Sequence, residues 1–117
     1  MPTGKYTYIG TSPGRGRGVF ALQDFKPNDL IEIAPVIPIP LDDGIMNCIS
    51  KLDDYVLKWD GDTIAIGLGY SFLYNHSDEP NAIRNDDYIN QVAIYRAIKH
   101  IKKDEEIFVK YKCDPWW

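Results

Sequence analysis

The chain has 117 residues, of which 44% are hydrophobic and 26% are charged, and its formal net charge is -4. This length and composition predict one globular domain over residues 1–117 and exclude a disordered chain. The negative charge argues against a nucleic-acid-binding surface. No apolar run is long enough to cross a bilayer, and the first residues lack the apolar stretch of a secretory signal. We therefore expect an intracellular protein.

The eight prolines and nine glycines favour short strands joined by turns over long helices. Two β-rich segments, Lys5–Ile9 and Val19–Leu22, flank a glycine-rich loop and are expected to form a hairpin with an enlarged turn. A turn is expected at Lys26–Asp29. The apolar segment Leu30–Ile39 follows, and we expect its prolines to confine it to a sheet edge or to a bend around the core.

The second half of the chain contains several further turn signals. Residues 42–54 are polar and irregular, which predicts a surface loop with one short helical turn. Tyr55–Trp59 and Thr63–Leu68 flank an Asp-Gly step, and this pattern predicts a hairpin. We expect a further turn at Asn85–Asp87. It is followed by an alternating strand over Gln91–Ala97 and by one last strand.

Three short segments carry the functional signal. Gly14–Gly18 has glycine at every second position, which lets backbone groups approach a ligand, although the spacing fits neither a dinucleotide loop nor a Walker loop. Tyr74–Asp78, followed by Pro80 and Asn81, sets many hydrogen-bonding groups beside apolar residues, as in a ligand pocket. Near the C-terminus, Glu105–Tyr111 is a glutamate pair followed by a short strand that ends in tyrosine.

In this order, the three segments resemble the G-x-G, N-H-S-x-x-P-N and C-terminal tyrosine motifs of the SET domain of protein lysine methyltransferases. The resemblance extends from about Ile9 to Trp117. It implies a mostly β fold of small sheets and short helical turns, with the C-terminal strand threaded in a knot-like arrangement. It also implies transfer of a methyl group from S-adenosylmethionine to a protein lysine, with a histone tail as the leading substrate.

The resemblance assigns six residues to the cofactor: Gly16, Arg17, Gly18, Tyr74, Asn75 and His76. The glycine segment would line the methionine end of S-adenosylmethionine, whereas Asn75 and His76 would contact its amino-acid end and adenine. Tyr74 would pack under the cofactor or against the core. Asn81 would fix the loop through its amide. Taken alone, the glycine segment is also compatible with a plain turn.

The resemblance makes Tyr111 the catalytic residue, with Tyr55 as a second tyrosine beside the lysine. A phenol hydroxyl at the bottom of a narrow channel can orient an amine toward a methyl group, provided that the amine has lost its proton. The expected channel residues are Val109, Tyr70, Trp116 and Trp117. The paired tryptophans would close the channel or anchor the C-terminus to the core. At Val109 the family commonly has tyrosine or phenylalanine, and a smaller side chain predicts di- or trimethylation.

The cysteines Cys48 and Cys113 form no metal-ligand pattern, and Asp78 stands where the family often has a cysteine, so we expect no metal site. The acidic pairs at 42–43 and 53–54 would attract a Lys- or Arg-rich partner, or serve solubility alone. Small stand-alone family members occur in viruses and bacteria, and some act on a host histone as homodimers. A nuclear or cytoplasmic location and a possible homodimer follow from this. The alternatives are a non-histone substrate and a catalytically silent peptide-binding module.

Overall fold

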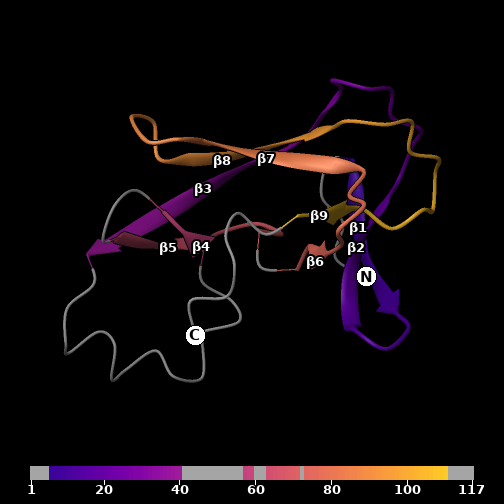
Figure 1. The fold of residues 1–117 in the computed structure, drawn as a ribbon, viewed down its shortest axis with the longest axis horizontal. Helices are drawn as coiled ribbons and strands as arrows, with labels where there is room; N and C mark the ends of the chain where they lie inside the picture. The colour runs from indigo at the N-terminus through magenta and orange to yellow at the C-terminus, as the bar shows by residue number, and fades with distance from the viewer. Residues whose placement is uncertain (1–5, 41–56, 60–62, 72, 111–117) are drawn as a thin grey trace.

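The computed structural model describes residues 6–40, 57–59, 63–71 and 73–110. These residues form strands joined by turns, and no helix occurs among them (Figure 1). The strands are β1 (Thr7–Ser12), β2 (Gly16–Ala21), β3 (Leu30–Pro40), β4 (Leu57–Lys58), β5 (Thr63–Gly67), β6 (Asn75–His76), β7 (Ala82–Asp87), β8 (Val92–Ala97) and β9 (Phe108–Val109). The expected mostly β architecture is therefore confirmed.

Strands β1 and β2 form the predicted N-terminal hairpin, with the Cα partners running from Thr7 and Ala21 to Ser12 and Gly16. The turn is shorter than expected because the strands continue through much of the glycine segment. Its backbone closes with a 3.0 Å hydrogen bond from the Arg15 amide to the Ser12 carbonyl. Gly14 and Gly16 have φ of 76° and 80°, a region that glycine enters without a steric penalty.

The other strands form a sheet in the order β4-β5-β3-β8-β7-β9-β6, with β3 near the middle (Figure 1). As a whole, β3 is not an edge strand of the sheet, although each half of it has an edge among the described residues. In the described residues, β3 pairs with β8 up to Pro35 and with β5 from Val36 onward. Each half of the strand thus has one described neighbour. This exchange of partners explains how β3 accommodates Pro35, Pro38 and Pro40.

Two antiparallel hairpins flank β3 in the sheet. Strands β4 and β5 pair across the predicted Asp-Gly turn, which itself lies outside the described residues. Strands β7 and β8 pair along their whole length, so Asn85–Asp87 belongs to a strand and the predicted turn there is wrong. The turn follows at residues 88–91. It forms there because Asp87 Oδ1 accepts hydrogen bonds from the amides of Ile89 and Asn90.

The C-terminal strand is held from three sides, and this arrangement positions the site. Strand β9 lies between β6 and β7 and pairs with both in parallel. The residues before it contact the N-terminal hairpin, since the Ile107 amide donates to the Val19 carbonyl at 2.8 Å. Ile107 and Val19 are both fully buried. The described residues contain no helix able to span a bilayer and no cluster of metal-binding side chains.

Candidate functional site

The glycine segment and the Asn75 motif meet at the carboxylate of Glu106. The Asn75 side-chain amide donates to Glu106 Oε2 at 2.8 Å and to the Arg17 carbonyl at 3.0 Å. The second carboxylate oxygen of Glu106 accepts a 2.7 Å hydrogen bond from the hydroxyl of buried Ser12. Three segments that are distant in sequence are therefore joined by polar contacts at one point.

Gly18 permits this close approach. A Cβ atom at position 18 would lie 2.9 Å from Asn75 Nδ2 and would also meet the Glu106 carboxylate. At Gly16, by contrast, the space around the position of a Cβ atom is open. Glycine is favoured there only because the backbone has a positive φ. The two glycines of the predicted G-x-G motif thus have different structural roles. Gly18 is the one that allows Asn75 to reach the backbone of β2.

Asn81 fixes the motif loop against β9, as predicted. Its amide nitrogen donates to the Glu106 carbonyl at 2.9 Å, and its oxygen accepts from the Phe108 amide at 2.8 Å. The Ser77 amide also donates to the Val109 carbonyl at 3.0 Å. These contacts hold β6 and β9 side by side. The side chains of both strands therefore have defined directions.

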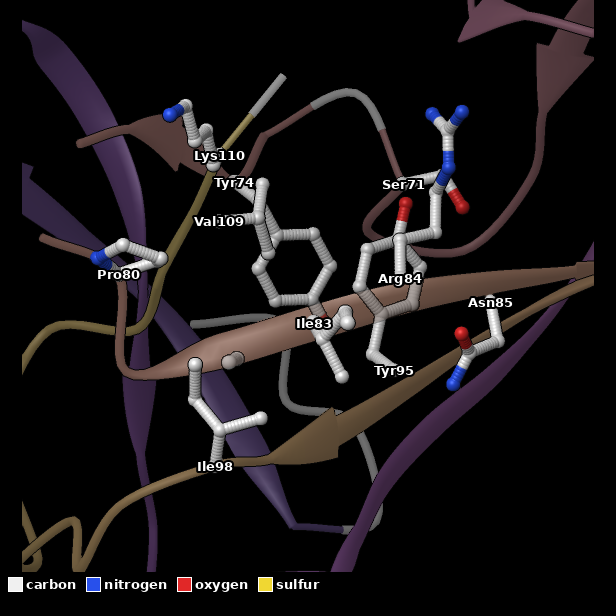
Figure 2. A pocket seen from close by; sticks show the side chains of 11 residues that line it. Ser71, Tyr74, Pro80, Ile83, Arg84, Asn85, Tyr95, Ile98, Val109 and Lys110 are labelled. Atoms are coloured by element: carbon white, nitrogen blue, oxygen red, sulfur yellow. The ribbon is translucent and has the colours of Figure 1, made fainter. Parts of the chain in front are cut away.

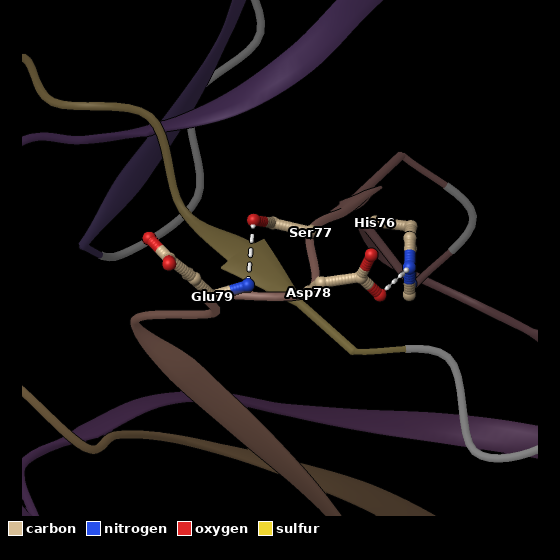
Figure 3. A network of polar contacts seen from close by, with 4 residues as sticks. All are labelled: His76, Ser77, Asp78 and Glu79. Carbon is tan, nitrogen blue, oxygen red and sulfur yellow. Dashed lines mark hydrogen bonds and ion pairs between the residues drawn. The ribbon is translucent and has the colours of Figure 1, made fainter.

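The exposed part of the motif loop contains His76. Its Nε2 lies 3.1 Å from Oδ1 of Asp78, and the side chain is 38% exposed (Figure 3). The Glu79 amide donates to Ser77 Oγ at 3.1 Å, which keeps the loop tight. Asp78 thus contacts His76 in the described structure.

The paired strands β6 and β9 separate two faces. Asn75 pairs with Phe108 and His76 pairs with Val109, and paired residues in a sheet direct their side chains to the same face. On the face of Asn75, the guanidinium of Arg15 lies 5.2 Å from the centre of the Phe108 ring, a cation–π distance. Val109, on the other face, is buried.

A cavity of about 480 Å³ opens beside Val109 (Figure 2). Among the described residues, β7 and β9 pair only at Ala82 and Val109, where β9 ends. The cavity is lined by Ser71, Tyr74, Pro80, Ala82, Ile83, Arg84, Asn85, Tyr95, Ile98, Val109 and Lys110. Its position next to Val109, two residues before Tyr111, is where the sequence predicts the lysine channel.

Two stacked tyrosines form part of the cavity wall. The rings of Tyr74 and Tyr95 are 4.2 Å apart, and both side chains are almost fully buried. Burial, and then the neighbouring Glu32 carboxylate, raise the pKa of Tyr74 well above its usual value. Burial also raises the pKa of Tyr95 to about 12. Both phenols therefore remain protonated at neutral pH and can donate hydrogen bonds.

An ion pair on β7 borders the same cavity. Arg84 Nε lies 2.9 Å from Asp86 Oδ1, and the side chains are 12% and 1% exposed. Residues two apart on a strand point to one face, so the guanidinium and the carboxylate can approach each other directly. The wall of the cavity thus contains a cation that is neutralised by a buried anion.

The structure places the predicted residues unevenly. Gly18, Arg17 and Asn75 are brought together, the Arg17 contact being through its backbone. Tyr74 and Val109 line the cavity, whereas Tyr70 is half-buried and donates its amide to Glu32 at 3.0 Å. Other predicted residues lie outside the described part of the chain: Tyr111, Tyr55, Trp116 and Trp117.

Sequence reasoning missed four residues of this region: Glu32, Arg84, Asp86 and Glu106. Glu32 had a detectable signal, because it is an acidic residue within the apolar segment Leu30–Ile39. Glu106 was part of the C-terminal motif, but its side chain was not assigned a role. Arg84 and Asp86 gave no signal, since the acidic run around them indicated a turn.

Comparison with known proteins supports the assignment from the motifs. A family model described as the SET domain matches residues 16–112. The chain belongs to the SET domain family. It is 29% identical over 104 residues to the "Histone-lysine N-methyltransferase, H3 lysine-37 specific" of Schizosaccharomyces pombe. The matched region covers 88% of this chain and 71% of the yeast protein.

This SET domain is also similar to a solved structure. A crystal structure of a candidate histone methyltransferase from Plasmodium falciparum matches with a TM-score of 0.73 and 36% identity, covering 92% of this chain and 98% of that chain. The predicted SET fold is confirmed. So is the predicted enzyme class, an S-adenosylmethionine-dependent protein-lysine N-methyltransferase, together with its methyl donor.

Proposed function

We propose that this SET domain methylates a lysine in a histone tail, using S-adenosylmethionine. The observation that carries the proposal is the junction of Gly18, Asn75 and Glu106 on one face of the β6–β9 pair, with a cavity beside Val109 on the other. This arrangement offers separate places for a methyl donor and an acceptor amine. The named activity of the yeast relative supports a histone as the substrate.

The described residues fit the cofactor's amino-acid end. Gly18 leaves room where a side chain would fill the space, and Asn75 is held rigidly next to it. Arg15, over the ring of Phe108, brings a positive charge to the same face, which suits a carboxylate. Gly16 and Arg17 would line the methionine end. The sequence assigns His76 to the adenine, but His76 pairs with Val109 and so directs its side chain to the face opposite Asn75. When bound, S-adenosylmethionine supplies the methyl group and a positive sulfonium.

The acceptor lysine would enter the cavity beside Val109. A lysine amine with a reference pKa near ~10.4 must lose its proton before it can attack. Desolvation in the cavity that Tyr74 and Tyr95 line, and the positive sulfonium of the bound cofactor, would both disfavour the ammonium. Tyr111 would orient the neutral amine through its hydroxyl, with Tyr55 as a second wall and the tryptophan pair as a lid. The small side chain of Val109 leaves room for a di- or trimethylated amine.

The proposed partner is a basic peptide segment, and the net charge of -4 favours its approach over that of a nucleic acid. A peptide can bind in an extended form beside an exposed strand. We also propose that the protein acts as a homodimer and works inside the cell, in the nucleus or cytoplasm, where histones are made and used.

Transfer of labelled methyl from S-adenosylmethionine to purified core histones and to whole-cell extract tests the function. We expect label on a histone with the wild type and its loss with Tyr111→Phe. Tyr8→Phe is the matched control, because among the described residues its hydroxyl donates to Asp104 and to no residue of the proposed site. Label on extract proteins alone would redirect the proposal to a non-histone substrate. Cofactor binding without any transfer would contradict it and indicate a peptide-binding module.

A further inference from the structure

The side chain of Glu106 contacts two strands, β1 through Ser12 and β6 through Asn75. Its Oε2 accepts from Asn75 Nδ2 at 2.8 Å, and its Oε1 accepts from Ser12 Oγ at 2.7 Å. Its backbone is fixed as well, because it pairs with Phe20 and accepts from Asn81 at 2.9 Å. The carboxylate therefore has a defined position between β1 and β6.

The contacts of Asn75 determine the orientation of its amide. A carboxamide has two N–H donors and one oxygen acceptor. Both neighbours of Nδ2, the Arg17 carbonyl and the Glu106 carboxylate, are acceptors only. A flipped amide would place its oxygen against two other oxygens, so this orientation is the only one that satisfies both contacts. What Asn75 can still offer to a ligand is its oxygen, which requires a donor on the ligand.

We propose that Glu106 is a positioning residue for cofactor binding, which fixes the Asn75 oxygen toward the ammonium group of the cofactor's amino-acid end. The inference rests on the proposed function and deepens it. Without the carboxylate, one Asn75 hydrogen loses its partner, and only the Arg17 carbonyl still orients the amide. A site that is no longer preorganised binds more weakly, because the ligand must order it.

Glutamine at position 106 is the conservative variant. Its amide oxygen can accept from Asn75 Nδ2, and its amide nitrogen can donate to the hydroxyl oxygen of Ser12. Glu106→Gln should therefore keep the orientation of Asn75, whereas Glu106→Ala should lose it. Glu105→Gln is the matched control. The Glu105 carboxylate accepts from the Lys102 amide at 2.6 Å and makes no described contact with Asn75.

Two probes separate positioning from a general effect on folding. S-adenosylhomocysteine contains the amino-acid end, whereas 5′-methylthioadenosine contains the adenosine and lacks that end. Calorimetric titration should show that Glu106→Ala weakens S-adenosylhomocysteine binding by about tenfold or more, equivalent to about 1.4 kcal/mol. It should leave the affinity for 5′-methylthioadenosine unchanged. Glu106→Gln should restore most of the lost affinity, and Glu105→Gln should behave as the wild type.

The kinetic counterpart is a raised KM for S-adenosylmethionine with a smaller change in kcat at saturation. Ser12→Ala removes only one of the two side-chain contacts of Glu106, so it should show the same pattern more weakly. This variant replaces Glu106→Ala in the test if Glu106→Ala does not fold. An equal loss of affinity for both probes, or unchanged S-adenosylhomocysteine binding in the alanine variants, would overturn the role of Glu106 and leave the proposed function intact. Failure of the wild type to bind S-adenosylhomocysteine would overturn the proposed function and this inference with it.

Discussion

The hydroxyl of Tyr74 donates a 2.6 Å hydrogen bond to Oε1 of Glu32, which lies 42 positions earlier in the chain. The other oxygen of Glu32 accepts from the Tyr70 amide at 3.0 Å. A single carboxylate on β3 thus holds the segment that leads into β6. Because Asn75 follows Tyr74 directly, this contact also helps to place the junction of Asn75 with Glu106.

Tyr74→Phe should destabilise the fold. The substitution keeps the buried ring but removes the donor to Glu32, and loss of a hydrogen bond to a charged group costs about 1.5–3 kcal/mol. Urea denaturation measures the change in the free energy of unfolding. Tyr8→Phe is the control, since it also removes a tyrosine–carboxylate hydrogen bond, at an exposed position, and should cost less. Equal losses in the two variants would contradict the importance of the buried contact.

Stability should fall at alkaline pH because of Tyr95. Burial raises its pKa to about 12 in the folded protein, from an ordinary value of 10.0, so the folded state retains a proton that the unfolded state loses between these values. The contribution of Tyr95 is therefore intact below pH 10 and is lost as pH rises toward 12, by about 2–3 kcal/mol. Urea denaturation at a series of pH values from 8 to 12 gives the free energy of unfolding at each pH. This free energy should fall less steeply with pH for Tyr95→Phe than for the wild type. Parallel slopes for the two proteins would refute this assignment.

Local patterns in the sequence predicted the strands and hairpins that are determined by neighbouring residues. The two β-rich segments around the glycines, the segments on either side of the Asp-Gly step and the alternation before Ala97 all contain described strands. The three motifs likewise predicted the family. These features depend on turn residues and on periodicity over a few positions, which a single sequence displays directly.

The remaining features depend on partners that are far away in sequence. The strand β3 accommodates its prolines because it exchanges partners at Pro35 and each half has one described neighbour, an exchange that no local pattern indicates. Asp86 pairs with Ala93 in a strand, and Arg84 neutralises its buried carboxylate. Glu106 reaches Ser12 across 94 positions, and Glu32 reaches Tyr74 across 42. A carboxylate in the sequence does not reveal which distant donor it will meet.

Gly18→Ala should weaken cofactor binding. The new Cβ would lie 2.9 Å from Asn75 Nδ2 and would displace either Asn75 or Glu106. The displaced side chain would no longer be preorganised for the ligand, so the affinity for S-adenosylhomocysteine should fall about tenfold, equivalent to about 1.4 kcal/mol. Gly14→Asn is the control, because position 14 has open space and asparagine tolerates its φ of 76°. Wild-type affinity in Gly18→Ala would mean that the junction of β2 and β6 does not form part of the cofactor site.

Val109→Tyr should restrict the product to monomethyl-lysine. Val109 is 6% exposed and lines the cavity of about 480 Å³, so a larger phenol ring would occupy space that a methylated amine needs. Its hydroxyl could also hold a water molecule where further methyl groups would lie. Mass spectrometry of a histone peptide after long incubation gives the ratio of mono-, di- and trimethylated product. Val109→Ile adds one methylene without a hydroxyl and should keep the wild-type pattern, provided that both variants retain the wild-type Tm. If the tyrosine variant still adds two or three methyl groups in the wild-type proportion, the cavity beside Val109 is not the place where the acceptor amine resides.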